Sequence, residues 1–158
     1  MRSELTVADL KTVAVLEHRE FATAEVAGQL VGIPVLEVQD VLNPVRITPI
    51  PLSRKEIAGL LNLRGRIVTA VDVRIRMGLT VNEGRDKCLS IVVEQNEELY
   101  SLIVDKVGDV LNLPITDFEQ NPPNLEASWA AVSDGVYRLD GRILLVLNVK
   151  KLLDYSPE

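Results

Sequence analysis

The sequence predicts a mainly β protein in which two small barrel-like units, each of four or five short strands, pack as one domain with short helices. Aromatic residues make up only 4% of the 158-residue chain, so the core must consist of Val, Leu and Ile, which favour strands. Apolar segments are short, and several alternate with polar residues at period two. Segments of the first half also recur in the second, which indicates a repeated unit.

The recurrence involves two pairs of segments in the same order, about seventy residues apart. Residues 30–44 (LVGIPVLEVQDVLNP) and 99–113 (LYSLIVDKVGDVLNL) are identical at seven of fifteen positions. Residues 63–77 and 139–153 share Leu, Gly, Arg, Ile and Val, and they align Asp72 with Asn148, two residues suited to capping a helix. The alternative explanation is that buried strands look alike because Val and Leu are common.

The first half contains three expected strands. Residues 21–26 alternate and are followed by Ala27-Gly28, which predicts a strand, a turn and a second strand over residues 29–38. Pro34 weakens that second strand because proline cannot donate to a ladder. GRIVTAV, residues 65–71, is too short and too β-branched for a helix, so a buried strand and then a helical turn from Asp72 are expected.

The second half repeats this order after a polar link at residues 80–87. Residues 88–95 and 98–107 predict two strands joined at Asn96-Glu97, and residues 119–128 predict a loop. Residues 132–149 then predict two strands across an Asp140-Gly141 turn. We therefore expect an N-terminal extension at residues 1–19 and one domain at residues 20–158, with a first lobe at about 20–80 and a second at about 85–155.

The extension carries a capping pattern, Thr6-x-x-Asp9, followed by Leu10 and Val13 at helical spacing, so a short helix is expected there. The formal net charge of −6 opposes the phosphate neutralisation on which nucleic-acid binding depends. No apolar run approaches the roughly 20 residues that span a bilayer, so no membrane insertion is expected. The single cysteine fits a reducing compartment, and a cytoplasmic location is expected.

Few residues are suited to catalysis. His18 lies among charged residues and is expected at the surface, and Cys88 begins an apolar strand, where a small core residue is expected rather than a reactive thiolate. No spacing resembles a zinc site, a phosphate-binding loop or a dinucleotide fingerprint, so neither a metal nor a cofactor is expected. Asp105 and Asp109 resemble a phospho-accepting pair only weakly, because a receiver fold needs long alternating helices. The sequence therefore predicts no enzyme.

The two copies differ just before their shared glycine, and residues that differ there could serve a partner. Asn62-Leu63-Arg64 stands in the first copy where Arg138-Leu139-Asp140 stands in the second, each just before a shared glycine. Residues common to both copies are expected to serve the scaffold, whereas those that differ are free to serve recognition. For Arg64, an exposed hairpin charge and an internal salt bridge remain alternatives to a partner contact.

The residues also resemble a known family. The segments EFATAEVAGQLVGIPVLEVQDVL, IPLSRKEIAGLLNLRGRIVTAVDVRIRMGL and LIVDKVGDVLNL are similar to those of the CheW chemotaxis coupling proteins, and the resemblance covers roughly residues 20–155. It implies two SH3-like, five-stranded β-barrel subdomains without catalysis. It also implies an adaptor that couples the cytoplasmic tips of chemoreceptors to the regulatory domain of the CheA histidine kinase, in arrays associated with the membrane.

The resemblance further implies receptor-facing residues on the first lobe. These are Val38, Asp40, Gly59, Asn62 and Arg64, with Val35 and Val107 as walls of a groove between the lobes, although the two valines could equally be core residues. Asp40 departs from the family pattern, because many members have Glu there. The kinase-facing surface is assigned to the second lobe without individual residues.

Three alternatives remain at this point. The same fold occurs as the regulatory module of a larger kinase and beside a receiver in CheV-type proteins. A small-ligand-binding β domain would require convergent polar groups, and an SH3-like nucleic-acid binder would require a basic face.

Overall fold

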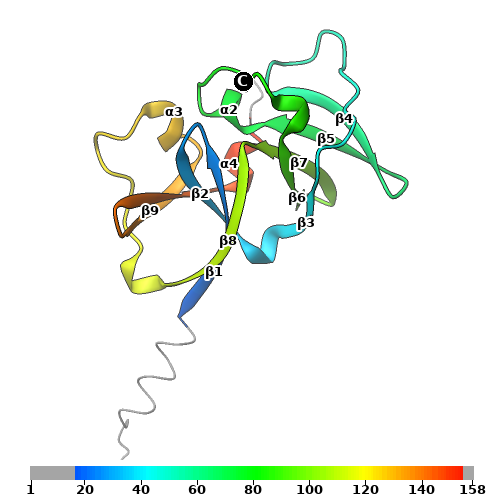
Figure 1. Ribbon diagram of the computed structural model, residues 1–158. Coiled ribbons are helices and arrows are strands. Elements are labelled where there is room, and N and C mark those ends of the chain that lie inside the picture. The colour runs from blue at the N-terminus through cyan, green and yellow to red at the C-terminus, as the bar shows by residue number, and fades with distance from the viewer. Residues whose placement is uncertain (1–16, 155–158) are drawn as a thin grey trace, which may run out of the picture.

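The computed structural model describes residues 17–154 and has ten strands in that range (Figure 1). The strands are β1 (His18–Val26), β2 (Gln29–Pro34), β3 (Val38–Leu42), β4 (Ile57–Leu63), β5 (Arg66–Asp72), β6 (Leu89–Gln95), β7 (Glu98–Val104), β8 (Lys106–Pro114), β9 (Ser133–Leu139) and β10 (Arg142–Leu147). The helix expected around Thr6 and Asp9 lies outside the described residues.

The helices are short, as predicted. They are α2 (Val73–Arg76), α3 (Ala127–Ala130) and α4 (Val149–Leu152), with 3-10 turns at η1 (Val35–Glu37), η2 (Arg85–Lys87) and η3 (Ile115–Asp117). The strands form two five-stranded sheets, which confirms the mainly β class. We call the sheet with the order β8-β1-β2-β10-β9 sheet A, and the sheet with the order β3-β6-β7-β5-β4 sheet B.

Sheet B is one continuous run of five strands in the middle of the chain, whereas sheet A combines strands that precede this run with strands that follow it. Sheet A combines β1 and β2 from the N-terminal part with β8, β9 and β10, and sheet B combines β3, β4 and β5 with β6 and β7. The lobes expected at about 20–80 and 85–155 therefore do not coincide with the sheets, and β1 begins at His18, inside the expected extension. Local patterning identifies strands, but it does not specify which distant strand each one pairs with.

The topology confirms the duplication. Replacing β1–β5 by β6–β10, and the reverse, converts one sheet order into the other. Each sheet has one parallel pair, β2 with β10 in sheet A and β5 with β7 in sheet B, and every other pairing is antiparallel. Asp72 accepts a hydrogen bond from the Arg74 N–H and Asn148 accepts one from the Lys151 N–H, so the two predicted caps are confirmed.

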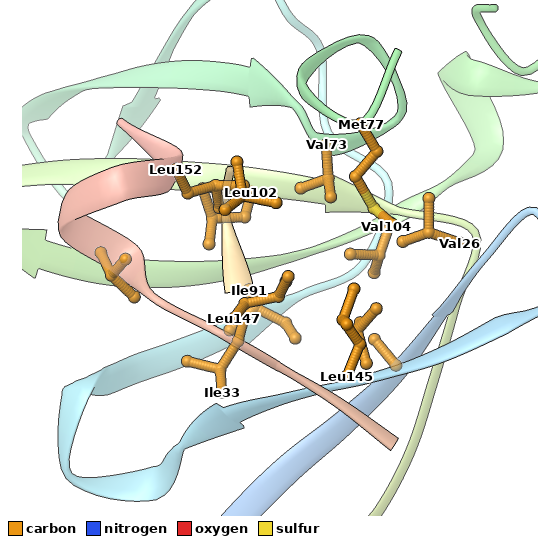
Figure 2. Packing of buried hydrophobic residues seen from close by; sticks show 14 of the residues in the cluster. Val26, Ile33, Val73, Met77, Ile91, Leu102, Val104, Leu145, Leu147 and Leu152 are labelled. Carbon is orange, nitrogen blue, oxygen red and sulfur yellow. The ribbon is translucent and has the colours of Figure 1, made fainter. Parts of the chain in front are cut away.

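The buried side chains form three clusters. Successive residues of a strand point to opposite faces of its sheet, so one strand can contribute to the core between the sheets and to the core inside its own sheet. The central core lies between the sheets and includes Val26, Ile33, Ile91, Leu102, Leu145 and Leu147, with Val73, Met77 and Leu152 from the adjoining helical turns (Figure 2). Core A lies inside sheet A, and its buried members are Phe21, Tyr137, Leu144 and Val146. Core B lies inside sheet B, and its buried members are Ala58, Leu61, Val68, Ala70 and Ile103. Edge strands meet in each: Leu42 of β3 and Leu61 of β4 pack in core B, so the sheet curls on itself.

The chain crosses from one sheet to the other twice, and Asp105 stands at the β7–β8 crossing. Its carboxylate accepts hydrogen bonds from Arg74 Nε (3.0 Å) and Nη2 (2.8 Å), from Asn82 Nδ2 (2.9 Å) and from the backbone N–H of Ala27 (2.7 Å). Burial alone would raise the pKa of Asp105, but the bonds from Arg74, Asn82 and Ala27 outweigh it and lower the pKa to about 2. Asp105 thereby fastens the β1–β2 turn of sheet A to α2.

Candidate functional site

Arg64 is held at the tip of the β4–β5 hairpin by the chemistry of its turn. Arg64 and Gly65 have φ values of 52° and 87°, which fits a two-residue hairpin turn with both central residues left-handed. The side-chain oxygen of Asn62 accepts a hydrogen bond from the Gly65 N–H at 3.0 Å. The sequence Asn-Leu-Arg-Gly thus closes the turn and projects Arg64 outward.

Arg64 reaches across sheet B to Asp40. Its Nη2 donates to Asp40 Oδ2 at 2.9 Å, and the side chains are 75% and 30% exposed, respectively. Asp40 Oδ1 accepts from the Val41 N–H at 2.8 Å. The hydrogen bond from Arg64, followed by the one from Val41, lowers the pKa of Asp40. An exposed ion pair of this kind contributes little stability, so its main effect is to fix the position of both charges.

The pair joins the two edges of sheet B. Asp40 belongs to β3 and Arg64 to the β4–β5 turn, and β3 and β4 are the outermost strands. Beside the pair is a shallow hollow lined by Leu63, Val92 and Leu99. Arg66 also lines the hollow, so the patch carries the Asp40–Arg64 pair and a second arginine above an apolar floor.

Sheet A lacks this pair although its backbone is equivalent. The strand correspondence places Asp109 at the position of Asp40, and Asp140 at that of Arg64. Within residues 17–154, neither Asp109 nor Asp140 takes part in an ion pair. The change from Arg64 to Asp140 between the two copies therefore leaves two acids in sheet A at the positions where sheet B has an ion pair.

The other residues expected at a receptor surface lie elsewhere. Val38 and Val107 occupy equivalent positions, and both are half-buried against the central core. Gly59 is buried, and a Cβ there would lie 2.3 Å from the carbonyl oxygen of Thr48, so close packing alone explains a glycine. Val35 lies in η1 and lines a second hollow. The structure therefore gathers Asp40, Asn62 and Arg64 and separates them from Gly59, Val35 and Val107.

Leu36 is an exposed apolar residue that the sequence did not single out. It is 95% exposed at the β2–β3 crossing, in the hollow that Val35, Pro34 and Arg19 also line. The strand correspondence makes it the counterpart of Asp105. The aligned repeats contained a signal for this residue, because Leu36 of the first copy is aligned with an acid, Asp105, of the second copy.

Other candidate chemistry is limited in the part of the chain that the structure describes. Residues 17–154 contain no group of three or more His, Cys, Asp or Glu side chains able to hold a metal ion. Cys88 is half-buried against core B, and burial raises the pKa of its thiol, as expected for a packing residue. Among these residues there is also no helix long and apolar enough to cross a membrane.

A duplicated β fold whose distinctive surface features are an edge-to-edge ion pair and exposed apolar side chains defines a protein-binding scaffold. The chain belongs to the CheW-like domain family, whose model matches residues 20–156. It is 30% identical over 147 residues to the chemotaxis protein CheW of Thermotoga maritima, covering 92% of this chain and 95% of that protein.

The chain is also similar to two further proteins. The solved structure of the scaffolding protein TtCheW from Thermoanaerobacter tengcongensis matches with a TM-score of 0.78 at 26% identity, covering 87% of this chain and 94% of that one. The protein PilI of Pseudomonas aeruginosa is 30% identical over 110 residues, or 70% of this chain and 62% of that protein. Together the matches identify a chemotaxis adaptor of the scaffold type.

Proposed function

We propose that this chain binds the cytoplasmic tip of a chemoreceptor through the Asp40–Arg64 edge of sheet B, and the regulatory domain of the CheA histidine kinase through a separate surface. The proposal places the protein in the cytoplasm, recruited to membrane-associated receptor arrays. It is supported by membership of the CheW-like family and by the 2.9 Å contact that holds an exposed Arg64 in place. That contact is the observation on which the receptor surface depends.

The geometry suits recognition of a helix. A guanidinium has five N–H donors, and Asp40 engages one of its nitrogens, so the others remain available to an acid or a carbonyl on the partner. Asp40 holds the side chain in one orientation before binding, which reduces the entropy lost when a partner docks. Val38, on the same strand as Asp40, would add an apolar wall, whereas Val35 and Val107 lie apart from this edge.

The kinase contact is proposed for residues of the second lobe, about 85–155. Within that range β8, β9 and β10 belong to sheet A, whereas the Asp40–Arg64 pair belongs to sheet B, so these three strands offer a surface on the other sheet. Two separate surfaces would let one adaptor hold both partners at once. Weak individual contacts would then gain strength from multivalency in an array.

The test is a calorimetric titration of the chain with a helical chemoreceptor-tip fragment, repeated with Arg64→Ala. We expect the variant to bind about tenfold more weakly, because it loses both its own contact and the anchoring of Asp40. Arg138→Ala is the matched control, since Arg138 is an exposed arginine on sheet A, paired with Glu119 at 2.9 Å. Equal affinity of both variants and the native chain would remove Arg64 from the receptor surface.

A further inference from the structure

Cores A and B have equivalent backbones but are filled differently. In core A, the ring of Tyr137 packs against those of Phe21 and Phe118, with centroids 5.6 and 5.5 Å apart. The strand correspondence places Ser90 at the position of Phe21, Ile47 at that of Phe118 and Leu61 at that of Tyr137. Core B therefore has no aromatic ring among its described members, and its side chains are smaller.

The equivalence of Phe118 and Ile47 follows from two matching contacts. Each residue precedes an isolated bridge, Glu119 with Val136 in one case and Thr48 with Leu60 in the other. Each also packs over a buried glycine: a Cβ on Gly135 would lie 2.4 Å from Phe118 Cζ, and one on Gly59 would lie 2.7 Å from Ile47 Cγ2. A phenyl ring thus occupies in core A the place where core B has a butyl side chain.

A hollow of about 490 Å³ opens at this place in sheet B. Its apolar wall includes Ile47 and Ala58, which are members of core B, together with Pro44 and Pro49 from the β3–β4 connection. The hollow therefore borders core B at Ile47 and Ala58.

The two connecting loops treat their apolar side chains differently. The β8–β9 connection sends Phe118 into core A and packs Leu125 and Trp129 on the central core. The β3–β4 connection, residues 43–56, leaves Val45, Ile50 and Leu52 exposed, and of these Val45 lines the hollow. Apolar residues left exposed around a hollow are typical of a surface that meets a partner.

The β3–β4 connection is basic although the whole chain carries −6. The β3–β4 connection contains Arg46, Arg54 and Lys55 against one acid, Glu56, which pairs with Arg54 at 3.2 Å. Arg46 lines the hollow, and within the described residues it has no ion pair. Arg85 also lines it but is paired with Asp72, and Asp86 adds one opposing charge. Arg46 therefore remains available at the hollow to an acid on a partner.

We propose that this hollow receives an aromatic side chain from an acidic segment of a partner protein. The ring would lie in the hollow against Ile47 and Ala58, and a flanking acid would pair with Arg46. The hollow lies on the β3–β4 connection, away from the hairpin that carries Arg64, so this site is independent of the proposed receptor surface.

The probe is the peptide acetyl-Glu-Glu-Phe-Asp-Asp-amide, titrated to millimolar concentration into the ¹⁵N-labelled full chain. We expect saturable shifts of the amide signals of Ile47 and Ala58, with affinity falling as salt increases, because the acids meet exposed cations. The same peptide with Ala in place of Phe should bind at least tenfold more weakly. Equal binding of the two peptides, or shifts confined to other strands, would overturn the proposal.

Two variants sharpen the test. Ile47→Phe places in core B the ring that core A has at the equivalent position, and it should abolish binding of the peptide. Arg46→Glu alters only an exposed charge and should weaken binding about tenfold. Ile143→Phe on sheet A and Arg64→Ala are controls that should bind as the native chain does, and thermal unfolding checks that each variant is folded. If Arg46→Glu bound normally, the charge assignment would be wrong. Concentration-dependent shifts without peptide would assign the hollow to a second copy instead.

Discussion

The two crossings between the sheets occupy equivalent places in the fold but carry opposite chemistry. At the β7–β8 crossing, Asp105 is largely buried and accepts hydrogen bonds from Arg74, Asn82 and Ala27. At the β2–β3 crossing, the equivalent Leu36 is almost fully exposed beside a hollow. One crossing fastens the sheets together, and the other presents an apolar side chain to the surroundings.

This difference shows how a duplicated scaffold divides its tasks. A single fastened crossing is enough to set the relation of the sheets, because the central core already buries apolar side chains from both. The second crossing is then free to diverge. The same logic separates Arg64, which pairs with Asp40, from Asp140, whose equivalent neighbour is another acid.

Exchanging the side chain at the fastened crossing should have the largest effect. Asp105→Leu leaves Arg74 and the Ala27 N–H without their partner in a site where Arg74 is only 21% exposed, so we expect a loss of about 3 kcal/mol of unfolding free energy. Urea unfolding measures it. Asp109→Leu is the control, because the Asp109 side chain is exposed, and it should change stability by less than about 0.5 kcal/mol.

Acid should weaken the same crossing. The folded-state pKa of Asp105, about 2, lies below its ordinary value of 3.8, so its contribution is complete above the ordinary value and is lost as the pH falls through the folded-state value. The stability difference between the native chain and Asp105→Asn should be constant from pH 7 to 5 and about 1 kcal/mol smaller at pH 3. An unchanged difference at pH 3 would contradict the assignment of the hydrogen bonds.

The reverse exchange should have the smallest effect on stability. Leu36→Asp places an acid at the equivalent position, but the residue equivalent to Arg74 is the exposed Lys150, and Leu36 itself buries almost no surface. We expect a change below about 0.5 kcal/mol in urea unfolding. A loss comparable with that of Asp105→Leu would mean that the two crossings are equally structural.

The sequence predicted individual strands well because alternation and turn residues are local signals. Residues 65–71 and 88–95 appear as β5 and β6, and the aligned caps Asp72 and Asn148 both begin helical turns. The strand expected over residues 29–38 ends instead at Pro34, after which η1 carries the chain to the other sheet. The assignment of strands to sheets depended on pairing between distant segments, which no local pattern specifies.

The sequence predicted those site residues that differ between the two copies. It did not predict the roles of residues that depend on packing between distant segments. Comparing Arg64 with Asp140 drew attention to the hairpin, and the salt-bridge alternative is confirmed, with Asp40 as the partner. The structural reason for Gly59 became apparent only from its approach to the carbonyl of Thr48. Val38 and Val107 were identified by resemblance, but their burial depends on a central core formed from both halves of the chain.

The formation of sheet A from strands that are early and late in the sequence has a consequence for how the protein is made. During synthesis β1 and β2 leave the ribosome first, but sheet A also requires β8, β9 and β10, so it cannot be completed until Leu147 has been added. Sheet B needs nothing beyond β7 and can assemble earlier. Until then the outer edges of β1 and β2 remain unpaired. During this interval the nascent chain would be open to chaperones or to premature self-association.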